Sequence, residues 1–352
     1  VKMTQNILII GAGIIGSALA YRIGQSGCTV SLLDPSEVGG AASSASFGWI
    51  NASYENPKPY YSLRRYAMDA WNRITPDLPN LPYNMNGTLY ADYYGVSLDT
   101  LHAEHTPWGY PFEWVTHDQI TILEPKLTKV PKHALYCEIE AQVIPDMAAK
   151  VFRQHAQNTT FIKTSATGLL TKGETIIGAN TNEGPIYADI TILAAGTHSQ
   201  ALAATAEIPV PLHTPAGLLI HTKPTTPLIS HTILTDGLHM QQRADGTVTA
   251  AGDFGGGSIN ENPDLGSNEL FSRLQEALDS NELEFSHHTL GIRPTPSDGM
   301  PIVGSPKNGL YVTVMHSGAT LAPGIAELVA AEIETGHRDA LLDTFHPDRF
   351  IS

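Results

Sequence analysis

The chain has 352 residues, enough for one large or two medium-sized domains with hydrophobic cores of their own. Its formal net charge is −15, and its 20 Lys and Arg residues form no basic stripe, so we do not expect it to bind nucleic acid. Cys28 and Cys137, its two cysteines, exclude a disulfide framework. With no signal-peptide pattern and no apolar run of bilayer length, we expect a cytoplasmic protein without an integral membrane segment.

The first stretch, residues 6–16 (NILIIGAGIIG), predicts a dinucleotide-binding turn. Residues 7–10 are a continuous aliphatic run, as in a parallel strand buried on both faces. Gly11 permits a tight turn, and Gly13 lets the backbone approach a pyrophosphate. Gly16 lets the next helix pack closely on the strand.

That helix, predicted over residues 14–26, would direct its unpaired N–H groups at the phosphates, with Ile14 and Ile15 at its start. A second strand over residues 29–33 ends at Asp34, which is placed to accept hydrogen bonds from an adenosine ribose. An ordinary Gly-rich turn is the alternative. The strand, the helix and the acid together favour a dinucleotide site, and they leave the identity of the dinucleotide open.

Residues 39–51 (GGAASSASFGWIN) are small and hydroxyl-rich and then become aromatic. Small residues let the backbone run close to a flat ligand, and serine hydroxyls can bond a phosphate or a ring carbonyl. A flexible loop is the alternative, which the aromatic residues disfavour. The candidate ligand contacts are Ser43, Ser44, Phe47, Gly48 and Trp49.

The following part of the chain mixes helix and strand patterns. Residues 57–74 predict an amphipathic helix, whose aromatic residues are more typical of a core than of a cofactor site. A short strand is expected at 90–94 and a helical patch at 96–104. Residues 108–123 are aromatic and irregular, and their pattern fits no single element.

Strand patterns return near residue 134, and Val143, an expected cofactor contact, precedes a helix predicted over residues 147–157. Two turn signals then separate the strands of an antiparallel meander. It leads into residues 189–199 (DITILAAGTHS), a buried strand that would deliver a close-packed turn at Ala195 and Gly196 to a cofactor.

Residues 213–289 predict a second sheet, with strands over 217–221, 238–243 and 247–251 and a helix over 268–278. The GGG run at residues 255–257 is expected to be a mobile loop and not a phosphate cradle, because no strand and helix frame it.

The C-terminal part carries a second informative stretch. Residues 291–304 (GIRPTPSDGMPIVG) form a proline-bound segment around one cation, Arg293. Residues 309–315 predict a buried strand that ends at His316. The helix that follows is predicted over residues 322–335, with a proline in its first turn.

Four blocks resemble, in their order and near their usual spacing, the FAD-dependent D-amino-acid oxidase superfamily, particularly its glycine oxidase, sarcosine oxidase and D-amino-acid dehydrogenase branches. The blocks are GAGIIG with Asp34, GGAASSASFGWIN, DITILAAGTHS, and GIRPTPSDGMPIVG followed by VMHSGATLAPG. Their combination, spanning residues 7–327, is much more specific than any single block.

The resemblance implies a two-domain α/β flavoprotein. A Rossmann-like FAD-binding domain of the glutathione reductase type would comprise residues 1–49, 136–212 and 290–352. A substrate domain, an α+β unit built on a mixed sheet, would comprise residues 50–135 and 213–289. FAD would be bound non-covalently, because the C-terminal block contains no cysteine for the linkage found in sarcosine oxidases.

Such enzymes oxidise a small amino acid or N-alkyl amino acid, for example a D-amino acid, glycine or sarcosine. A hydride passes from the carbon that bears the amine to flavin N5, water hydrolyses the imine, and O2 or another carrier takes the electrons. Arg293, also expected beside the cofactor, matches the family's arginine that binds the substrate carboxylate, a role that suits a planar guanidinium. A structural arginine bonded to loop carbonyls is the alternative. No metal is expected.

The block that begins at His316 matches the family's flavin-edge motif, where a helix N-terminus would stabilise the anionic N1–C2=O side of reduced flavin. His316 either faces the flavin as a catalytic residue or is a satisfied, partly buried histidine. The remaining expected contacts are Ser317, Gly318, Ala319, Thr320 and Leu321, with Gly318, Ala319 and Leu321 supplying backbone N–H groups.

His239 stands where glycine oxidase-like members carry a tyrosine that contacts the substrate. A histidine there could donate to a carboxylate and is counted as a catalytic candidate; a core or rim histidine is the alternative.

Three other interpretations compete with this one. An NAD(P)-dependent dehydrogenase explains GAGIIG and Asp34 but not the later blocks. A flavin-binding component of a multi-chain amine or opine-type dehydrogenase stays open, as does a homo-oligomer. The net charge argues against a nucleic-acid-modifying flavoprotein of the same fold.

Overall fold

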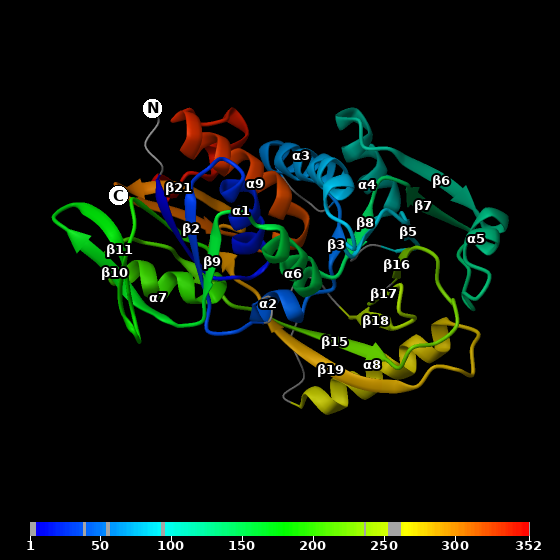
Figure 1. Cartoon of the computed structure of the whole chain (residues 1–352). Coiled ribbons are helices and arrows are strands. Elements are labelled where there is room, and N and C mark those ends of the chain that lie inside the picture. The colour runs from blue at the N-terminus through cyan, green and yellow to red at the C-terminus, as the bar shows by residue number, and fades with distance from the viewer. Residues whose placement is uncertain are drawn as a thin grey trace.

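The computed structural model describes residues 5–37, 40–53, 57–92, 96–235, 237–252 and 262–351. Its helices and strands are arranged around two large sheets that lie at opposite sides of the molecule (Figure 1). Gly39, the GGG run at 255–257 and part of the strand predicted at 90–94 fall outside the described residues.

The first sheet is assembled from the beginning, middle and end of the chain. Its central strands pair in parallel, with Ile7 opposite Ile190 and Val30, and the edge strand of residues 302–307 pairs antiparallel to its neighbour. This confirms the predicted strands at 7–10 and 29–33. The order is β21 (Ile302–Lys307), β22 (Leu310–Val314), β13 (Ile190–Leu193), β1 (Asn6–Ile10), β2 (Thr29–Leu33) and β9 (Thr159–Ile162).

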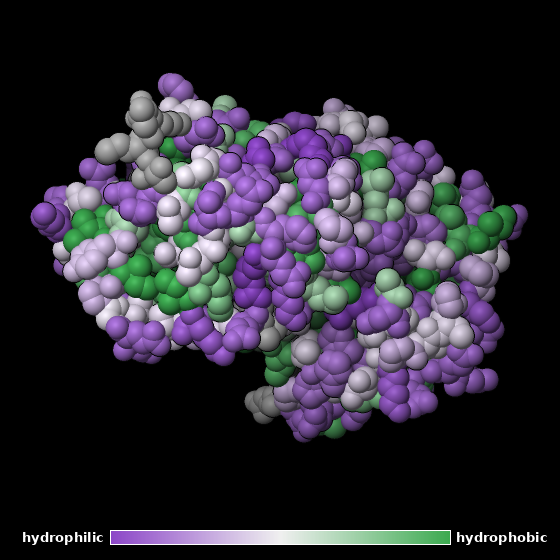
Figure 2. All heavy atoms as spheres, in the orientation of Figure 1, coloured by the Kyte–Doolittle hydropathy of each residue, from purple (hydrophilic) through white to green (hydrophobic). Residues whose placement is uncertain are grey.

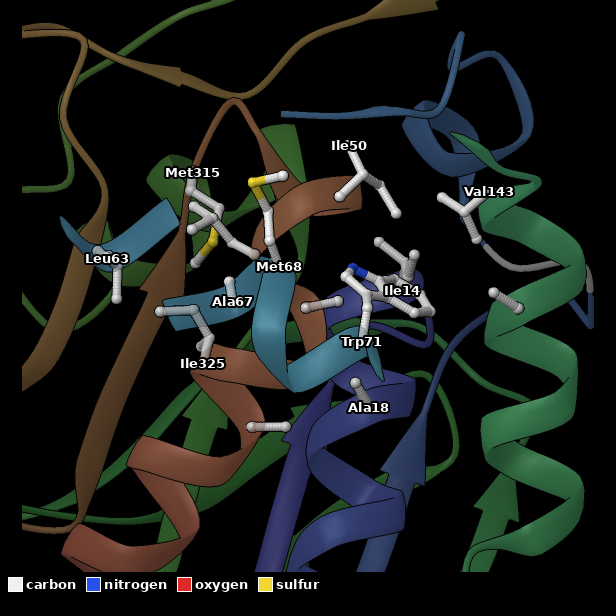
Figure 3. Packing of buried hydrophobic residues seen from close by; sticks show 14 of the residues in the cluster. Ile14, Ala18, Ile50, Leu63, Ala67, Met68, Trp71, Val143, Met315 and Ile325 are labelled. Atoms are coloured by element: carbon white, nitrogen blue, oxygen red, sulfur yellow. The ribbon is translucent and has the colours of Figure 1, made fainter. Parts of the chain in front are cut away.

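Four helices pack together beside this sheet. The helices are α1 (Ile14–Gly24), α3 (Lys58–Ile74), α6 (Pro145–His155) and α9 (Gly318–Thr335). Figure 3 shows Trp71 of α3 beside Ile14 of α1, and Ala67 of α3 facing Ile325 of α9. Gly324 allows this approach, because an added Cβ would meet the Cα of Ala67 at 2.7 Å. Tyr61 and Trp71 of α3 are buried in this core, as their spacing predicted, and Tyr66 packs against it half-buried.

The start of α9 differs from the prediction. The helix begins at Gly318 and not at 322, so Pro323 lies inside it. Proline has no N–H to donate to the carbonyl four residues earlier, that of Ala319. The Trp71 indole N–H supplies this donor, at 3.1 Å from the Ala319 oxygen and 3.1 Å from that of Thr320. Tertiary packing thus lets the helix begin about one turn before its proline.

A small antiparallel meander lies at the edge of this half, as predicted. It consists of β10 (Ala166–Lys172), β11 (Thr175–Thr181) and β12 (Gly184–Tyr187), next to α7 (Ser199–Ala204). On the face shown in Figure 2, hydrophobic residues gather around this part of a largely hydrophilic surface.

The second large sheet is mixed, as the family resemblance implies. Only the β16–β5 pair is parallel among its described pairs. Helix α8 (Pro263–Ala277) packs on β15, β17, β18 and β19. The order is β19 (Phe285–Ile292), β15 (Ala216–Thr222), β18 (Val248–Ala251), β17 (Leu238–Gln242), β16 (Thr232–Thr235), β5 (Thr88–Tyr90), β7 (His133–Cys137) and β6 (Phe112–Thr116).

The segment at 108–123, which fitted no single element, contains β6 and the helix α5 (His117–Leu123). Thr116 and Gln119 form a capping box at the boundary, which fixes where the strand ends and the helix begins. The helical patch expected at 96–104 is α4 (Leu98–His105). Shorter elements are α2 (Ala41–Ser44), β3 (Trp49–Ile50), β4 (Tyr83–Asn84), β8 (Ala141–Val143), β14 (Leu212–His213) and β20 (Thr295–Pro296).

The domain limits stay a prediction. Strand β19 runs from Phe285 to Ile292 and pairs with β15 along its length, so it crosses the predicted limit at residue 290. Over the described parts of the chain, no helix combines the length and the apolar character that spanning a bilayer requires.

Candidate active site

Two adjoining cavities lie between the sheets and their loops. The cofactor cavity, as we call the first, has a volume of about 540 Å³ and opens at the carboxyl ends of β1, β2 and β13. The second, the substrate cavity, has a volume of about 400 Å³ and reaches the eight-stranded sheet at β15 and β19. Five residues line both cavities, which makes them one elongated site: Ala42, Ser46, Pro294, His316 and Ala319.

The predicted glycine turn lines the cofactor cavity. Gly11 has φ +105°, a conformation that favours glycine, and an added Cβ would collide with the carbonyl of Ala194. A Cβ on Gly16 would collide with the carbonyl of Gly11, so Gly16 supports the turn from behind and does not line the cavity. Gly13, Ile14, Ile15, Ala195 and Gly196 are lining residues, as expected.

Asp34 also lines the cofactor cavity, at the end of β2. Its Oδ2 accepts the Ala12 N–H at 2.8 Å, and its Oδ1 accepts the Ser36 N–H at 2.8 Å. Each carboxylate oxygen has a second lone pair, so two ribose hydroxyls can still donate to it. These bonds fix the carboxylate in place before a ligand binds.

The serine-rich segment is a short helix and strand that lines both cavities. Ser43 Oγ accepts the Ile14 N–H at 3.1 Å, at the N-terminus of α1. Phe47, Gly48 and Trp49 line the substrate cavity. Ser44, in contrast, lines neither cavity and donates to the Ala41 carbonyl, so the structure does not bring it to the cavities with the other expected contacts.

Val143 supports the site from behind. Its N–H donates to the Gly48 carbonyl at 2.9 Å, and its own carbonyl occupies the space where a Cβ on Gly48 would lie. Gly48 also has φ +80°. Glycine is therefore favoured at this position both by the backbone conformation and by the lack of space for a Cβ. Val143 itself lines neither cavity; the structure places it behind the wall, and its direct contact with a cofactor stays a prediction.

Arg293 lies in the wall of the substrate cavity, directly after β19. Its backbone N–H donates to the Pro215 carbonyl at 3.0 Å. Its guanidinium lies against β15 at Gly217, where an added Cβ would collide with Nη2. Gly217 in the neighbouring strand therefore leaves the space that the Arg293 guanidinium occupies.

His316 lines both cavities at the end of β22, where its ring is accessible from the cavity although protein surrounds it. Burial, then the Arg293 and Arg64 cations, lowers the pKa of His316 to about 4. The imidazole is therefore neutral at pH 7. Its Nδ1 lies 3.3 Å from Ser317 Oγ, at the N-terminus of α9.

The structure brings most, but not all, of the residues expected along the start of α9 to the two cavities. Ser317, Gly318, Ala319 and Thr320 line one or both cavities. Leu321 does not: it is fully buried, and its N–H donates to the Ser317 carbonyl at 3.0 Å. Since α9 begins earlier than predicted, this N–H belongs to the regular helical pattern and is not available to a ligand.

His239 lies on β17, is fully buried, and lines neither cavity. The direct catalytic role considered for it is not supported, and its environment is that of a core residue. Two positions along the same strand, Gln241 donates through Nε2 to the Phe47 carbonyl and so supports the cavity wall.

Arg64 is the main site residue that the sequence did not identify. It lies on α3 and lines the substrate cavity together with Asn51, Pro57 and Tyr60. Its side chain falls on the same helix stripe as Tyr60, Ala67 and Trp71, three or four residues apart. A cation on a helix stripe that is otherwise buried is the sequence feature that could have identified Arg64.

The glycine turn and Asp34 therefore line one cavity, which continues into a second cavity lined by two arginines, an arrangement that suits a cofactor-dependent redox enzyme. The sequence profile of the FAD dependent oxidoreductase family, DAO, matches residues 6–332. The chain belongs to this family of FAD-dependent enzymes, which act on amines and amino acids.

Individual relatives are similar over nearly their full length. Glycine oxidase from Bacillus licheniformis is 25% identical, over 94% of this chain and 93% of its own. One of the subunits of opine oxidase from Agrobacterium tumefaciens is 24% identical, over 98% and 97%. The crystal structure of glycine oxidase from Geobacillus kaustophilus superposes with a TM-score of 0.86 at 21% identity, covering 98% of this chain and 99% of the other.

The cofactor cavity fits FAD, the family's cofactor. The glycine turn at Gly11 and Gly13 lines it where a pyrophosphate would lie, and Asp34 is held at the ribose position of such sites. The cavity also continues past Ala42 and Ser46 to His316, as a ligand longer than a mononucleotide requires.

Proposed function

We propose that this enzyme oxidises the C–N bond of a small amino acid or N-alkyl amino acid to an imine. The observation that carries the proposal is the position of Arg293 in a cavity that adjoins the cofactor cavity at His316. When bound, FAD supplies the acceptor for the hydride that leaves the substrate carbon.

Arg293 would bind the substrate carboxylate through two N–H groups of its planar guanidinium. This fixes the carboxylate at the β15 and β19 wall, and therefore the α-carbon on the side that faces His316 and α9. Positioning of this kind is the main contribution that such a reaction needs from the protein, since no protein nucleophile takes part.

His316 would act as a neutral group beside the substrate nitrogen. With a pKa of about 4 it adds no positive charge at pH 7, so it does not repel an amine and can accept a hydrogen bond from it. The unpaired N–H groups at the start of α9 would stabilise negative charge on the bound cofactor.

The cofactor would be held without a covalent bond. Asp34 would bind the ribose, the glycine turn and the α1 N-terminus would bind the phosphates, and residues from Phe47 to Trp49 would contact the ring. Neither Cys28 nor Cys137 is among the described residues that line the two cavities. Denaturation in acid should then release all of the flavin into the supernatant.

Product analysis tests the reaction. The purified protein is incubated with glycine, sarcosine and the D- and L-forms of several primary amino acids, and 2-oxo acid or aldehyde and released amine are quantified. Equal amounts of the carbonyl product and the amine would support imine formation and hydrolysis. If the flavin is reduced without either product, C–N oxidation is the wrong reaction.

A second candidate is a flavin-binding component that needs partner chains. Similarity to the opine oxidase chain over nearly the whole length favours it. In that case the isolated chain would bind FAD but turn over slowly with every amine, and co-expression with neighbouring genes would restore turnover. Comparing O2 with an artificial acceptor would separate an oxidase from a dehydrogenase in either case.

A further inference from the structure

We propose that the substrate cavity binds a substrate with two carboxylates, one on Arg293 and the other on Arg64. Amines of this kind are the acidic amino acids and the N-carboxyalkyl amino acids. The inference rests on the proposed function, because it specifies the substrate class of the same site. It adds a second anion-binding group that faces the same cavity from α3.

Arg64 is a buried cation bonded only to neutral groups. It is 5% exposed. Its Nε donates to the Asn51 carbonyl at 2.9 Å, its Nη2 to Asn51 Oδ1 at 2.8 Å, and its Nη1 to Ser317 Oγ at 2.7 Å. Within the described parts of the chain, no Asp or Glu pairs with it. A buried charge without a counter-charge is costly, and an anionic ligand would remove that cost.

Two donors of Arg64 remain available for such a ligand. A guanidinium has five N–H donors, and the bonds to Asn51 and Ser317 use three of them. The remaining N–H groups are on Nη1 and Nη2, the pair that binds a carboxylate in the two-pronged geometry. Arg64 lines the substrate cavity, where we place the second carboxylate of the ligand against these two groups.

A buried polar cluster holds this part of the wall in place. Glu140, fully buried, accepts the Tyr90 hydroxyl at 2.6 Å, the Trp49 indole N–H at 2.8 Å and the Tyr110 hydroxyl. Ser53 Oγ lies 2.6 Å from the Tyr90 hydroxyl and 3.4 Å from Asn51 Oδ1. Asn51, which binds Arg64 twice, is thus connected to a rigid interior, and the guanidinium is held ready for a ligand.

The charges around the cavity favour a substrate with net negative charge. The charged residues among its described lining are Arg64, Arg293 and Asp298. Asp298 already pairs with Arg349, with N–O distances of 2.7 and 3.2 Å. Arg64 therefore has no counter-charge among the described residues that line the cavity, in a chain whose net charge is −15. A zwitterion with one carboxylate would place it on only one of the two arginines.

Arg64 and Arg293 both influence His316, which lines the cavity. Arg64 reaches His316 through Ser317 Oγ, and His316 carries the effect of both Arg293 and Arg64 on its pKa. A substrate that spans the two arginines would therefore place its central amine near His316. Arg64 does not line the cofactor cavity, which separates it from the phosphate-binding end of the site.

Binding is the first test, because it does not require turnover. The FAD-loaded protein is titrated by calorimetry with succinate and malonate, and with propionate and acetate as one-carboxylate controls. We expect the dicarboxylates to bind more tightly. We expect Arg64→Gln to weaken them by about 10- to 100-fold, the range for a charged hydrogen-bonded pair, and the monocarboxylates by less than about threefold.

Kinetics is the second test. D- and L-aspartate, D- and L-glutamate and iminodiacetate are compared with glycine, sarcosine and D-alanine in wild type, Arg64→Gln, Arg64→Lys and the control Arg65→Gln. Arg65 is the neighbouring helix residue that faces Asp69 at 3.9 Å. We expect Arg64→Gln to raise KM selectively for the dicarboxylates, Arg64→Lys to recover part of the loss, and Arg65→Gln to leave it unchanged.

Each other outcome has a definite meaning. Oxidation of monocarboxylates only, with no preference for dicarboxylates in binding, would overturn the inference and leave the proposed function intact. If Arg64→Gln weakened all substrates alike and altered the flavin spectrum, Arg64 would serve the cofactor and the inference would be wrong. If no amine were oxidised but dicarboxylates bound in an Arg64-dependent way, the two-anion site would stand and the proposed function would fail.

Discussion

The indole of Trp71 donates a hydrogen bond to the carbonyl of Ala319, the one carbonyl of α9 that Pro323 leaves without its helical donor. The distance is 3.1 Å, and the neighbouring Thr320 carbonyl is equally close. Through this bond, α3 stabilises the first turn of α9, which contains residues that line the two cavities. The position of Ala319 and Thr320 in the site depends on this contact.

Replacing Trp71 with Phe should therefore lower the free energy of unfolding by about 2–4 kcal/mol, because a buried carbonyl loses its donor and the core loses volume. The measurement is urea unfolding followed by circular dichroism. In a Pro323→Ala background the new N–H can bond Ala319, so the same replacement should cost about 1 kcal/mol less. Identical costs in both backgrounds would contradict this role of the indole.

Removing the Arg293 guanidinium should impair substrate binding more than cofactor binding. We expect Arg293→Ala to raise KM for a carboxylate-bearing amine by about 100-fold, while the flavin content stays that of wild type. Arg293→Lys should recover only part of this, because an ammonium cannot bind a carboxylate through two parallel bonds. Unchanged steady-state kinetics in the alanine variant would remove Arg293 from the site.

A substitution at Gly217 tests the same cation without removing its charge. An added Cβ would collide with the Arg293 guanidinium, so Gly217→Ala should displace it and raise KM by about 10-fold. Gly252→Ala is the matched control, since a Cβ there meets its nearest neighbours at an ordinary 3.8 and 3.9 Å. Equal kinetics for the two variants would mean that Arg293 tolerates displacement or lies elsewhere in solution.

Loss of the Asp34 carboxylate should weaken FAD retention. Asp34→Ala removes the acceptor for the ribose hydroxyls and for the Ala12 and Ser36 N–H groups, so the Kd for FAD should rise by at least about 10-fold. Fluorescence of released flavin measures it. Glu37→Gln is the control, because Glu37 is an exposed residue that pairs with Lys163 at 3.0 Å. Full retention in the alanine variant would place the ribose elsewhere.

His221 should make the fold sensitive to moderate acid. Burial, then Arg243 and His287, lowers the pKa of His221 to about 3 from an ordinary value near 6.5. The unfolded chain then binds a proton that the folded chain does not, so stability falls as the pH drops below about 6.5 and continues to fall towards 3. Between pH 7 and pH 5 this one group should account for about 2 kcal/mol.

The check is urea unfolding of wild type and His221→Gln at both pH values, with His337→Gln, a change at an exposed histidine, as control. The difference in stability between pH 7 and pH 5 should be about 2 kcal/mol smaller in the His221 variant only. The same pH dependence in all three proteins would show that His221 is not held neutral by the fold.

Features encoded in contiguous sequence were predictable. The strand at 7–10, the glycine turn and Asp34 follow from local backbone requirements, and the structure brings all of them to one cavity. Arg293 was predictable through the resemblance, because its proline-rich segment is distinctive. In each case the residues that form the feature are close together in the chain.

Features that arise where distant segments of the chain meet could not be predicted from the sequence. Arg64 is a site residue because Asn51 and Ser317, the latter 253 positions away, meet it at the cavity. The first turn of α9 includes a bond from Trp71 to Ala319, and the Leu321 N–H is bonded to Ser317 within that turn. His239 lies within a strand whose neighbours bury it, a fact that alternation along one strand cannot reveal.

The most direct test of the account is an absorbance spectrum of the purified protein before and after anaerobic addition of candidate amines. We predict flavin bands in the purified protein, and their loss on addition of at least one amino acid or N-alkyl amino acid, with one equivalent of substrate consumed for each flavin. A protein without flavin bands that does not gain them when FAD is added would contradict the central claim.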